Sequence, residues 1–490
     1  MLSQHDTDRS RWLALYVLCT GMLMIVLDAT VVNVALPTIQ DDLGFSASSL
    51  AWVVNAYLIA FAGLLLLAGR LGDLVGRRRV LLSGLGLFTG ASLLCGAAQS
   101  QQVLVAARFV QGIGGALASA VILGMIVTMF PEPHERAKAL GVYGFVASAG
   151  GSIGLVAGGV LTQSMNWHWI FLVNIPIGIV TAVLAIRLVP DDAGIGLREG
   201  ADLPGAMLIT SALMLAVYTV VEPAAKEGWA SGTTLALGGL AVVLLSAFLA
   251  RQATARRPIM PLRIFRSRVT VGANAVQVLS VAGMFGMFFL GSLYLQRILG
   301  YGALSIGLAF LPTTVVMGVL SLRYSGPMLM RFGARIPLVG GLLVIAAALA
   351  LFTRAPVQGN YFVHVLPVML LLGCGAGFCF PALMTLAMSD TAPTDAGLAS
   401  GLANTTAQAG GALGLAVLAT FSSSHAGSLL RSGSSEPAAL TSGYHLAFAI
   451  AAALVLAAVA VALVVIKPNP ASAEVDAELE TAPREVLTSR

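Results

Sequence analysis

The chain has 490 residues, of which 58% are hydrophobic and 10% are charged. Soluble proteins carry about 25% charged residues, and the shortfall runs along the whole chain, which excludes a soluble domain with a single membrane anchor. The net charge of +5 does not indicate nucleic-acid binding, because the basic residues lie in short segments between apolar runs. We therefore expect an all-α polytopic membrane protein embedded in a lipid bilayer.

The apolar runs predict fourteen membrane-spanning helices, since a spanning helix needs about 20 largely apolar residues. In chain order they are expected at 12–36, 49–69, 80–98, 103–129, 139–161, 168–188, 203–222, 233–250, 269–296, 303–322, 337–353, 362–388, 397–420 and 443–466. Residues 1–11 are polar and lack a cleavable signal pattern, so the first helix is expected to remain in place.

The basic residues predict the orientation of these helices. With the N-terminus inside, the outer side receives only four of them, Lys226, Arg297, Arg354 and Arg431. Basic residues favour the cytoplasmic side of a membrane. We therefore expect both termini in the cytoplasm and the chain in a bacterial inner membrane.

Two polar segments, one acidic (189–202) and one basic (251–268), divide the helices into groups of six, two and six. The predicted organisation is a cytoplasmic N-terminus (1–11), an N-terminal six-helix bundle (12–188), a linker with helices 7 and 8 (189–268), a C-terminal six-helix bundle (269–466) and a disordered cytoplasmic tail (467–490). The tail is polar and acidic, which is typical of disorder.

The two six-helix groups repeat two patterns at nearly constant offsets. Gly69, Gly76 and Arg78 match Gly326, Gly333 and Arg335, and Gly141, Gly150, Gly151 and Gly154 match Gly401, Gly410, Gly411 and Gly414. Both groups enter the membrane from the same side, so the repeat is parallel. Transporters use such halves to rock about a central site.

Two charges lie away from helix ends, Asp28 in the first helix and Arg108 in the fourth. Charges inside a membrane are costly and mark functional sites by default. Asp28 lies about 22 Å along its helix from the cytoplasmic end, at a depth where pairing with Arg108 is possible. A permanent salt bridge is one interpretation; the other is a carboxylate that alternately binds and releases a proton, with burial favouring the protonated form and arginine the ionised one.

Three further groups of residues are candidates for function. The first is a loop that contains Gly69, Asp73, Gly76, Arg77 and Arg78. Its Asp73 carboxylate can face a helix N-terminus and latch the cytoplasmic side. Gly141, Gly150, Gly154, Gly158 and Gly159 place small residues on one helix face, for close packing or as a hinge. Candidates for a substrate cavity are Asn33, Asn55, Tyr57, Gln111, Gln277, Phe285, Asn404 and Gln408.

The aromatic and methionine residues at 284–289 are expected to face lipid rather than line an adaptable pocket.

The cysteines, Cys19, Cys95, Cys374 and Cys379, lie in apolar runs without a C-x-x-C or Cys/His cluster. We therefore expect no metal and no other cofactor.

These motifs resemble the major facilitator superfamily, specifically its fourteen-helix drug:proton antiporters. The similar segments are Leu27–Pro37, Gly69–Arg78, Arg108–Ala116, the glycines of the fifth helix and Trp167–Pro176. The resemblance implies two six-helix bundles plus two linker helices, and proton-driven export of amphipathic drugs or antibiotics. It implies that Arg108 assists a proton relay and that Asp73, Arg77 and Arg78 gate the cytoplasmic side; Asp28 is the candidate for proton coupling.

The chain departs from the family pattern at three positions. Leu155 replaces the proline of the fifth helix, Leu74 replaces an arginine after Asp73, and Met330 stands where the second half repeats the aspartate. We therefore expect unequal halves and coupling through the first.

Three alternatives remain open: a dedicated exporter of one endogenous metabolite or lipid, a membrane-embedded enzyme, and a non-transporting sensor. The six histidines are scattered near helix ends, which disfavours the enzyme. A sensor should tolerate loss of Asp28. The expected partners are protons and a small amphipathic substrate, with the chain working as a monomer.

Overall fold

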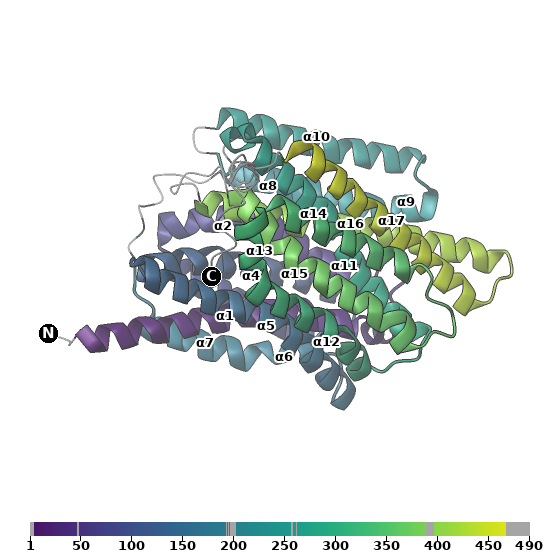
Figure 1. The fold of residues 1–490 in the computed structure, drawn as a ribbon, viewed down its shortest axis with the longest axis horizontal. Coiled ribbons are helices and arrows are strands. Elements are labelled where there is room, and N and C mark those ends of the chain that lie inside the picture. The colour runs from purple at the N-terminus through teal and green to yellow at the C-terminus, as the bar shows by residue number, and fades with distance from the viewer. Residues whose placement is uncertain are drawn as a thin grey trace, which may run out of the picture.

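The computed structural model describes residues 4–46, 49–192, 194, 196, 202–255, 258–260, 262–388 and 396–466. Every regular element in these residues is a helix. Figure 1 shows the long helices lying alongside one another. The predicted tail at 467–490 lies outside the described residues.

The first group of helices runs from the N-terminus to the linker. It comprises α1 (Gln4–Leu43), α2 (Ala51–Val75), α3 (Arg77–Gly96), α4 (Gln101–Met129), α5 (Pro133–Ser164), α6 (Trp169–Leu172) and α7 (Asn174–Leu188). The linker comprises α8 (Leu203–Val221), α9 (Pro223–Glu227), α10 (Gly232–Thr254) and the 3-10 helix η2 (Leu262–Arg266).

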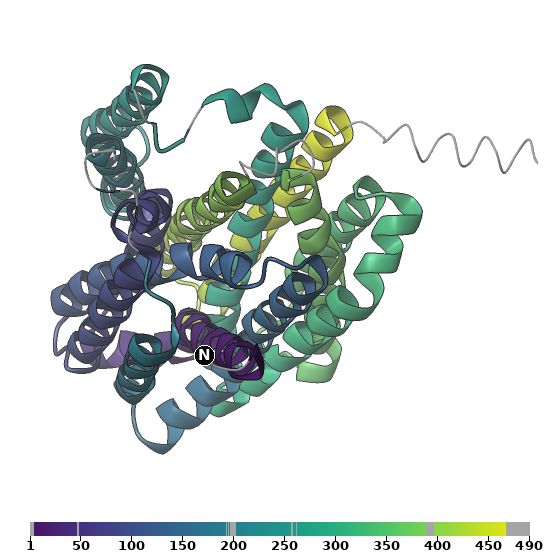
Figure 2. The same ribbon diagram turned by 90° about the vertical axis from the view of Figure 1, so that its left-hand side faces the viewer.

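The last group extends from the linker to residue 465. It comprises α11 (Arg268–Arg297), α12 (Ala303–Val319), α13 (Ser325–Phe332), α14 (Arg335–Phe352), α15 (Leu366–Met388), α16 (Ala396–Arg431), α17 (Glu436–Val465), and the π-helical turns η3 (Leu320–Tyr324) and η4 (Tyr361–Val365). Figure 2 shows this group beside the first.

Twelve helices of the described residues are long and apolar enough to cross a membrane. The predicted span at 49–69 falls on α2, which is bent between Leu65 and Leu67. The predicted span at 139–161 falls within α5. The all-α polytopic fold is therefore confirmed, and the count of fourteen crossings stays a prediction.

Helices α8 and α10 pack against each other, and α10 lies at one edge of the molecule (Figure 1). Helix α8 contacts α2 and α16, one helix from each group. On the α2 side, a Cβ at Gly63 would lie 2.3 Å from Thr210 Oγ1, so the two backbones approach closely. On the α16 side, Thr420 Oγ1 donates to the Val220 carbonyl at 3.2 Å. Helix α8 thus covers the line where α2 meets α16.

Asp202 joins the two linker helices at the start of α8. Its Oδ1 accepts from the Gly205 backbone N–H at 3.1 Å and from Arg251 Nε at 2.7 Å, and its Oδ2 accepts from Gln252 Nε2 at 2.8 Å. Burial raises the pKa of Asp202, but the hydrogen bonds from Arg251, Gln252 and Gly205 outweigh it, so the pKa lies below its ordinary value. The sequence marked Asp202 only as part of an acidic segment.

Replacing Asp202 with alanine is expected to destabilise the linker pair, since loss of a helix cap costs about 1 kcal/mol and leaves Nε2 of Gln252, a residue that is 3% exposed, without its acceptor. Because the pKa is lowered in the folded state, the ionic stabilisation is present at neutral pH and is lost as pH falls below about 4. Thermal unfolding in detergent should show Asp202→Asn less stable than the parent at pH 7, with the difference shrinking in acid. Asp191→Asn, at an exposed position, is the control; an equal effect there would contradict this role.

Candidate functional site

Asp28 of α1 and Arg108 of α4 form an ion pair deep in the N-terminal group of helices. Arg108 Nη1 lies 2.5 Å from Asp28 Oδ2, and each residue is 1% exposed. The pairing that their depths allow is therefore present in the structure. Two charges withdrawn from water pay a large desolvation penalty, which is offset only when the remaining donors and acceptors are satisfied.

Neighbouring polar side chains supply the remaining hydrogen bonds of this ion pair. Asp28 Oδ1 accepts from Gln111 Nε2 at 2.7 Å and from Asn174 Nδ2 at 2.9 Å. Gln111 Oε1 accepts from Arg108 Nη1 at 2.6 Å. Ser92 Oγ accepts from Gln111 Nε2 at 2.8 Å and donates to the Phe88 carbonyl. The buried network, defined here as Asp28, Arg108, Gln111, Asn174 and Ser92, therefore connects α1, α3, α4 and α7.

Helix α2 also contacts the Arg108 side chain. Arg108 Nε donates to the Val53 carbonyl at 2.9 Å, and its guanidinium lies 4.4 Å from the centre of the Tyr57 ring. A cation over an aromatic face is stabilised by the ring quadrupole. Among the described residues, neither Asn55 nor the Tyr57 hydroxyl has a hydrogen-bond partner, although both side chains are buried.

The buried network differs in two ways from the sequence expectation. Asn55, Tyr57 and Gln111, expected on a substrate cavity, are buried inside the bundle and line neither of the cavities described below. Asn174 and Ser92 were missed, although a polar residue inside the apolar run before Pro176 is a signal for Asn174. In this conformation Asp28 has no opening to solvent, which is the geometry of the permanent salt bridge.

At the corner between α2 and α3, the segment expected as a loop at 69–79 is mostly helical. Helix α2 continues to Val75 and α3 begins at Arg77, with Gly76 alone between them at φ +106°. A Cβ at Gly76 would lie 2.4 Å from the Asp192 carbonyl oxygen, so glycine is required there. Asp73 therefore lies in the last turn of α2, and the expectation of a loop over 69–79 was wrong.

Asp192, which follows α7, caps the start of α3. Its carboxylate accepts from the backbone N–H groups of Arg77 at 2.9 Å and Arg78 at 3.2 Å. A carboxylate at a helix N-terminus satisfies free N–H groups and interacts favourably with the helix dipole. The predicted latch residue Asp73 instead pairs with Arg77 of α3 at 3.2 Å. These contacts join α2, α3 and the linker, and the gating role stays a prediction.

The glycines of α5 lie where this helix approaches two others. A Cβ at Gly154 would lie 2.0 Å from Thr30 Oγ1, and one at Gly158 would lie 2.9 Å from the Val31 carbonyl, both in α1. A Cβ at Gly159 would lie 2.6 Å from Leu304 Cα of α12. Gly150 also faces α1, and the surroundings of Gly141 lie outside the described part of α5. Helix α5 runs unbroken through Leu155.

The matching glycines of α16 pack in the same way on α11. A Cβ at Gly410 would lie 2.8 Å from Val278 Cα, and one at Gly414 would lie 2.4 Å from Ala282 Cα. Gly333, the counterpart of Gly76, also has a positive φ of +67° and separates α13 from α14. The sequence repeat therefore corresponds to repeated packing and a repeated turn.

The expectation that residues 284–289 face lipid was wrong. Met284, Met287 and Phe289 of α11 are each at most 6% exposed. Phe285 covers Gly411 of α16, where an added Cβ would lie 3.2 Å from the phenyl ring. Helix α11 packs against both α16 and α17, so these side chains fill the core of the C-terminal group.

A cavity of about 210 Å³ lies among α11, α15 and α16. We call it the amide-lined cavity, because the residues that line it include Asn274, Gln277 and Asn404. Its apolar wall includes Phe380, Leu383 and Met384. Two residues predicted for a substrate cavity, Gln277 and Asn404, thus lie together; Asn33 instead donates to the Ala29 carbonyl of its own helix at 3.2 Å. Gln408, on α16, is partly buried.

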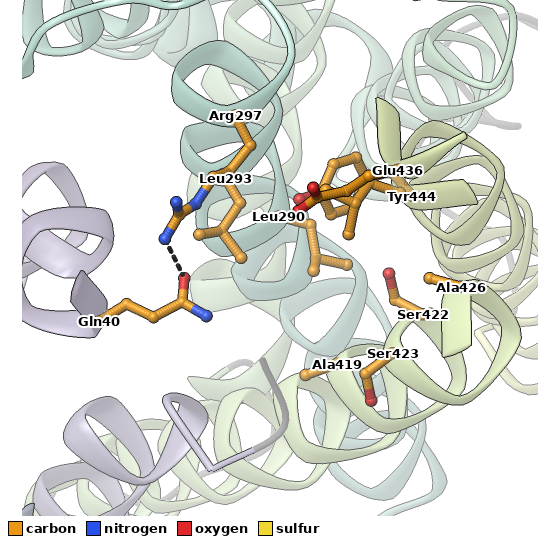
Figure 3. Close-up of a pocket in the computed structure, with 11 residues that line it drawn as sticks. Gln40, Leu290, Leu293, Arg297, Ala419, Ser422, Ser423, Ala426, Glu436 and Tyr444 are labelled. Carbon is orange, nitrogen blue, oxygen red and sulfur yellow. Dashed lines mark hydrogen bonds between the residues drawn. The ribbon is translucent and has the colours of Figure 1, made fainter. Parts of the chain in front are cut away.

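Figure 3 shows a second cavity, also of about 210 Å³. Its lining residues include the ends of α1, α11 and α17 that are predicted to face outside. Gln40 of α1 lines it together with Arg297 of α11 and Glu436 and Tyr444 of α17. Arg297 Nη2 donates to Gln40 Oε1 at 3.2 Å and pairs with Asp41. Nearby, Gln163 Oε1 of α5 accepts from the Leu304 backbone N–H of α12 at 3.2 Å. The two helix groups are therefore joined at this end.

Replacing Arg297 with alanine is expected to loosen this end. Partly exposed ion pairs contribute up to about 1 kcal/mol, so the fraction of molecules that are open at this end should increase up to about fivefold. The measurement is the rate at which a membrane-impermeant maleimide labels Ser423→Cys, a position on the second cavity, with and without Arg297→Ala.

Arg354→Ala, at an exposed arginine predicted on the same side, is the matched control for Arg297. The charge exchange Asp41→Arg with Arg297→Asp should restore slow labelling. Unchanged labelling in Arg297→Ala would show that the contact does not hold this end closed.

Comparison with known proteins identifies the family. The family model described as the Major Facilitator Superfamily matches residues 18–415. The puromycin resistance protein of Streptomyces alboniger is 40% identical over 450 residues, 91% of this chain and 89% of that protein. The cephamycin export protein CmcT of Amycolatopsis lactamdurans is 38% identical, over 89% and 88% of the two chains. The lincomycin resistance protein of Streptomyces lincolnensis is 36% identical, over 84% of each.

Solved structures show the same fold at low sequence identity. A bacterial homolog of the human lysosomal transporter Spinster, inward-facing and occupied, matches with a TM-score of 0.66 and 14% identity, over 94% of this chain and 97% of that one. The human organic anion transporter MFSD10 matches with a TM-score of 0.59 and 16% identity, over 92% and 99%. The chain therefore belongs to the Major Facilitator Superfamily and is a multi-pass membrane transporter, not an enzyme.

Proposed function

We propose that this transporter exports amphipathic antibiotics or drugs from the cytoplasm in exchange for protons. The observation that carries the proposal is 36–40% identity, over 84–91% of the chain, to three proteins named for antibiotic resistance or export. The predicted setting is a bacterial inner membrane, with both termini in the cytoplasm and the monomer as the working unit.

The transport cycle would rock residues 12–188 against residues 269–466. Contacts of Arg297 with Gln40 and Asp41 support a conformation closed on the outer side. Opening that side requires these contacts to break, together with the close approach of Gly159 to Leu304. The amide-lined cavity then offers substrate contacts on the C-terminal bundle.

Asp28 is our candidate for proton coupling because, among the described spanning helices, it is the acid that lies far from a helix end. Its carboxylate is occupied by Arg108, Gln111 and Asn174 in this conformation. Coupling therefore requires the buried network to open in another conformation. Protonation would remove the negative charge that holds Arg108, loosening α1 from α4 and α7.

A second candidate function is dedicated export of a single compound, favoured because the relatives above are each named for one antibiotic. Expression in drug-sensitive bacteria lacking their own pumps separates the two. A broad pump should raise the minimum inhibitory concentrations of several unrelated compounds, whereas a dedicated exporter should raise at most one. No protection against any antibiotic would contradict both antibiotic-export assignments, leaving an endogenous metabolite or lipid as the cargo.

A further inference from the structure

We infer that Tyr57 of α2 is a positioning residue for proton coupling: its ring holds the Arg108 cation on α2 when Asp28 takes up a proton. This role depends on the proposed coupling through Asp28 and specifies which helices separate. It follows from the contacts of Arg108, some of which depend on the charge of Asp28 while others do not.

Arg108 is held from two sides, by α1 and by α2. On the α1 side, Arg108 Nη1 lies 2.5 Å from Asp28 Oδ2. On the α2 side, the Val53 carbonyl accepts from Arg108 Nε at 2.9 Å, and the centre of the Tyr57 ring lies 4.4 Å from the guanidinium carbon. A proton on Asp28 cancels the negative charge on the first side and leaves the second side unchanged. Arg108 is therefore expected to stay with α2 after Asp28 is protonated.

The Tyr57 ring lies closer to the Arg108 cation than the Phe171 ring of α6, whose centre is 5.6 Å away. Tyr57 and Arg108 are each 1% exposed. A cation–π contact stabilises a desolvated cation more than an exposed one. While Asp28 is ionised, its carboxylate supplies most of the stabilisation of the cation; once Asp28 is neutral, the Tyr57 ring supplies a larger share.

Close packing joins α2 to α4 around this contact. A Cβ at Gly112 would lie 2.4 Å from the Tyr57 carbonyl oxygen, and one at Gly115 would lie 3.0 Å from Tyr57 Oη. Small residues let two membrane helices approach this closely. Helices α2 and α4 therefore hold Arg108 between them as one unit, and neutralising Asp28 loosens α1 from that unit.

This separation reaches the C-terminal bundle, because the helices that separate contact different parts of it. Helix α2 packs on α16, whereas α1 packs on α5, which in turn packs on α12. Gly154 and Gly158 keep α5 close to Thr30 and Val31 of α1. A shift of α2 and α4 relative to α1 and α5 is therefore expected to move α16 relative to α12, which changes how the two bundles meet.

The first test is thermal unfolding of the purified full-length protein in detergent, with Asp28→Asn standing for the protonated carboxyl. Tyr57→Leu should destabilise the protein in both backgrounds. In the Asp28→Asn background its effect on the folding equilibrium should be about tenfold larger than in the parent, equivalent to 1.4 kcal/mol, because the ring then supplies more of the stabilisation of Arg108. Tyr57→Phe keeps the ring and should show no such excess.

Two further variants separate the electrostatic contact from packing. Phe61→Leu removes another buried ring of α2, one turn further along, which packs on the same Gly115; it should cost the same in both backgrounds. Tyr57→trifluorophenylalanine keeps the volume of the ring but weakens the negative charge on its face. It should show an excess between those of Tyr57→Phe and Tyr57→Leu, and it provides the measurement if Tyr57→Leu with Asp28→Asn does not fold.

Transport supplies a readout that loss of packing alone would not change in this way. In inverted vesicles with a pH gradient, Tyr57→Leu should lower the maximal rate per amount of folded protein and leave the half-saturating substrate concentration unchanged, because it disfavours the protonated intermediate. Tyr57→Phe should keep the maximal rate of the parent. An unchanged maximal rate in Tyr57→Leu would contradict the positioning role.

Equal costs of Tyr57→Leu in the two backgrounds would overturn the inference, as would an equal excess for Phe61→Leu. The unfolding measurements need neither a gradient nor a substrate, so they stand whether or not the protein exports antibiotics. Normal gradient-driven transport by Asp28→Asn would instead refute the proposed coupling through Asp28, and with it the coupling role of Tyr57, while the excess in unfolding would still report its contact with Arg108.

Discussion

Asp28→Asn is expected to abolish accumulation of substrate driven by a pH gradient. Asparagine keeps the shape of the side chain but cannot take up and release a proton. The measurement uses inverted membrane vesicles with and without an imposed pH gradient, and a compound to which the parent confers resistance. Transport should be compared per amount of folded protein, because the change leaves Arg108, 1% exposed, without its counter-charge.

Asp42→Asn is the matched control for Asp28→Asn. Asp42 also lies on α1, near its C-terminal end, where Oδ2 accepts from Trp167 Nε1 at 2.8 Å. This variant should keep gradient-driven accumulation. Undiminished accumulation in Asp28→Asn would assign proton coupling to another residue.

Arg108→Gln is expected to destabilise the protein by about 3–5 kcal/mol, because it leaves the buried Asp28 carboxylate without a positive partner. The double variant Asp28→Asn with Arg108→Gln should recover most of that loss, since no uncompensated charge remains. Thermal unfolding of the parent, the two single variants and the double variant in detergent gives the coupling energy of the pair. If the double variant is no more stable than Arg108→Gln, the ion pair is not the source of the stabilisation.

The same double variant separates the two interpretations of the ion pair. If Asp28 and Arg108 form only a structural bridge, the refolded double variant should regain transport together with stability. If Asp28 carries the proton, stability should return while gradient-driven accumulation stays lost. The buried network in this conformation has the geometry of the structural bridge, so transport by the double variant is the measurement that decides.

Asn174 of α7 is a member of the buried network that the sequence did not mark. Its amide donates to Asp28 Oδ1 at 2.9 Å and lies 3.5 Å from Ser92 Oγ. It stabilises the ionised carboxylate from α7, a helix that the resemblance did not implicate in coupling. Asn174 was missed because neutral polar residues are frequent in membrane helices, and a single sequence does not define which way each one points.

The linker shows the same limit for acids outside the membrane. Asp192 and Asp202 stood out only as members of an acidic segment, yet one caps α3 and the other joins α8 to α10. Acids are common in polar segments for solubility alone. Their roles depend on a helix end brought close by folding, which spacing along the chain does not reveal.

By itself the sequence determined the membrane fold and the family motifs and marked Asp28 and Arg108 as a possible pair, because length, apolar runs and isolated interior charges carry strong energetic penalties if misplaced. Tertiary structure decided which apolar side chains fill the core: Met287 and Phe289 are buried, although the sequence favoured lipid contact. The physical reason is that lipid tails and a bundle core are equally apolar, so hydrophobicity does not distinguish one face of a membrane helix from the other. Packing also decided that Gln111 joins the buried network while Gln277 lines a cavity.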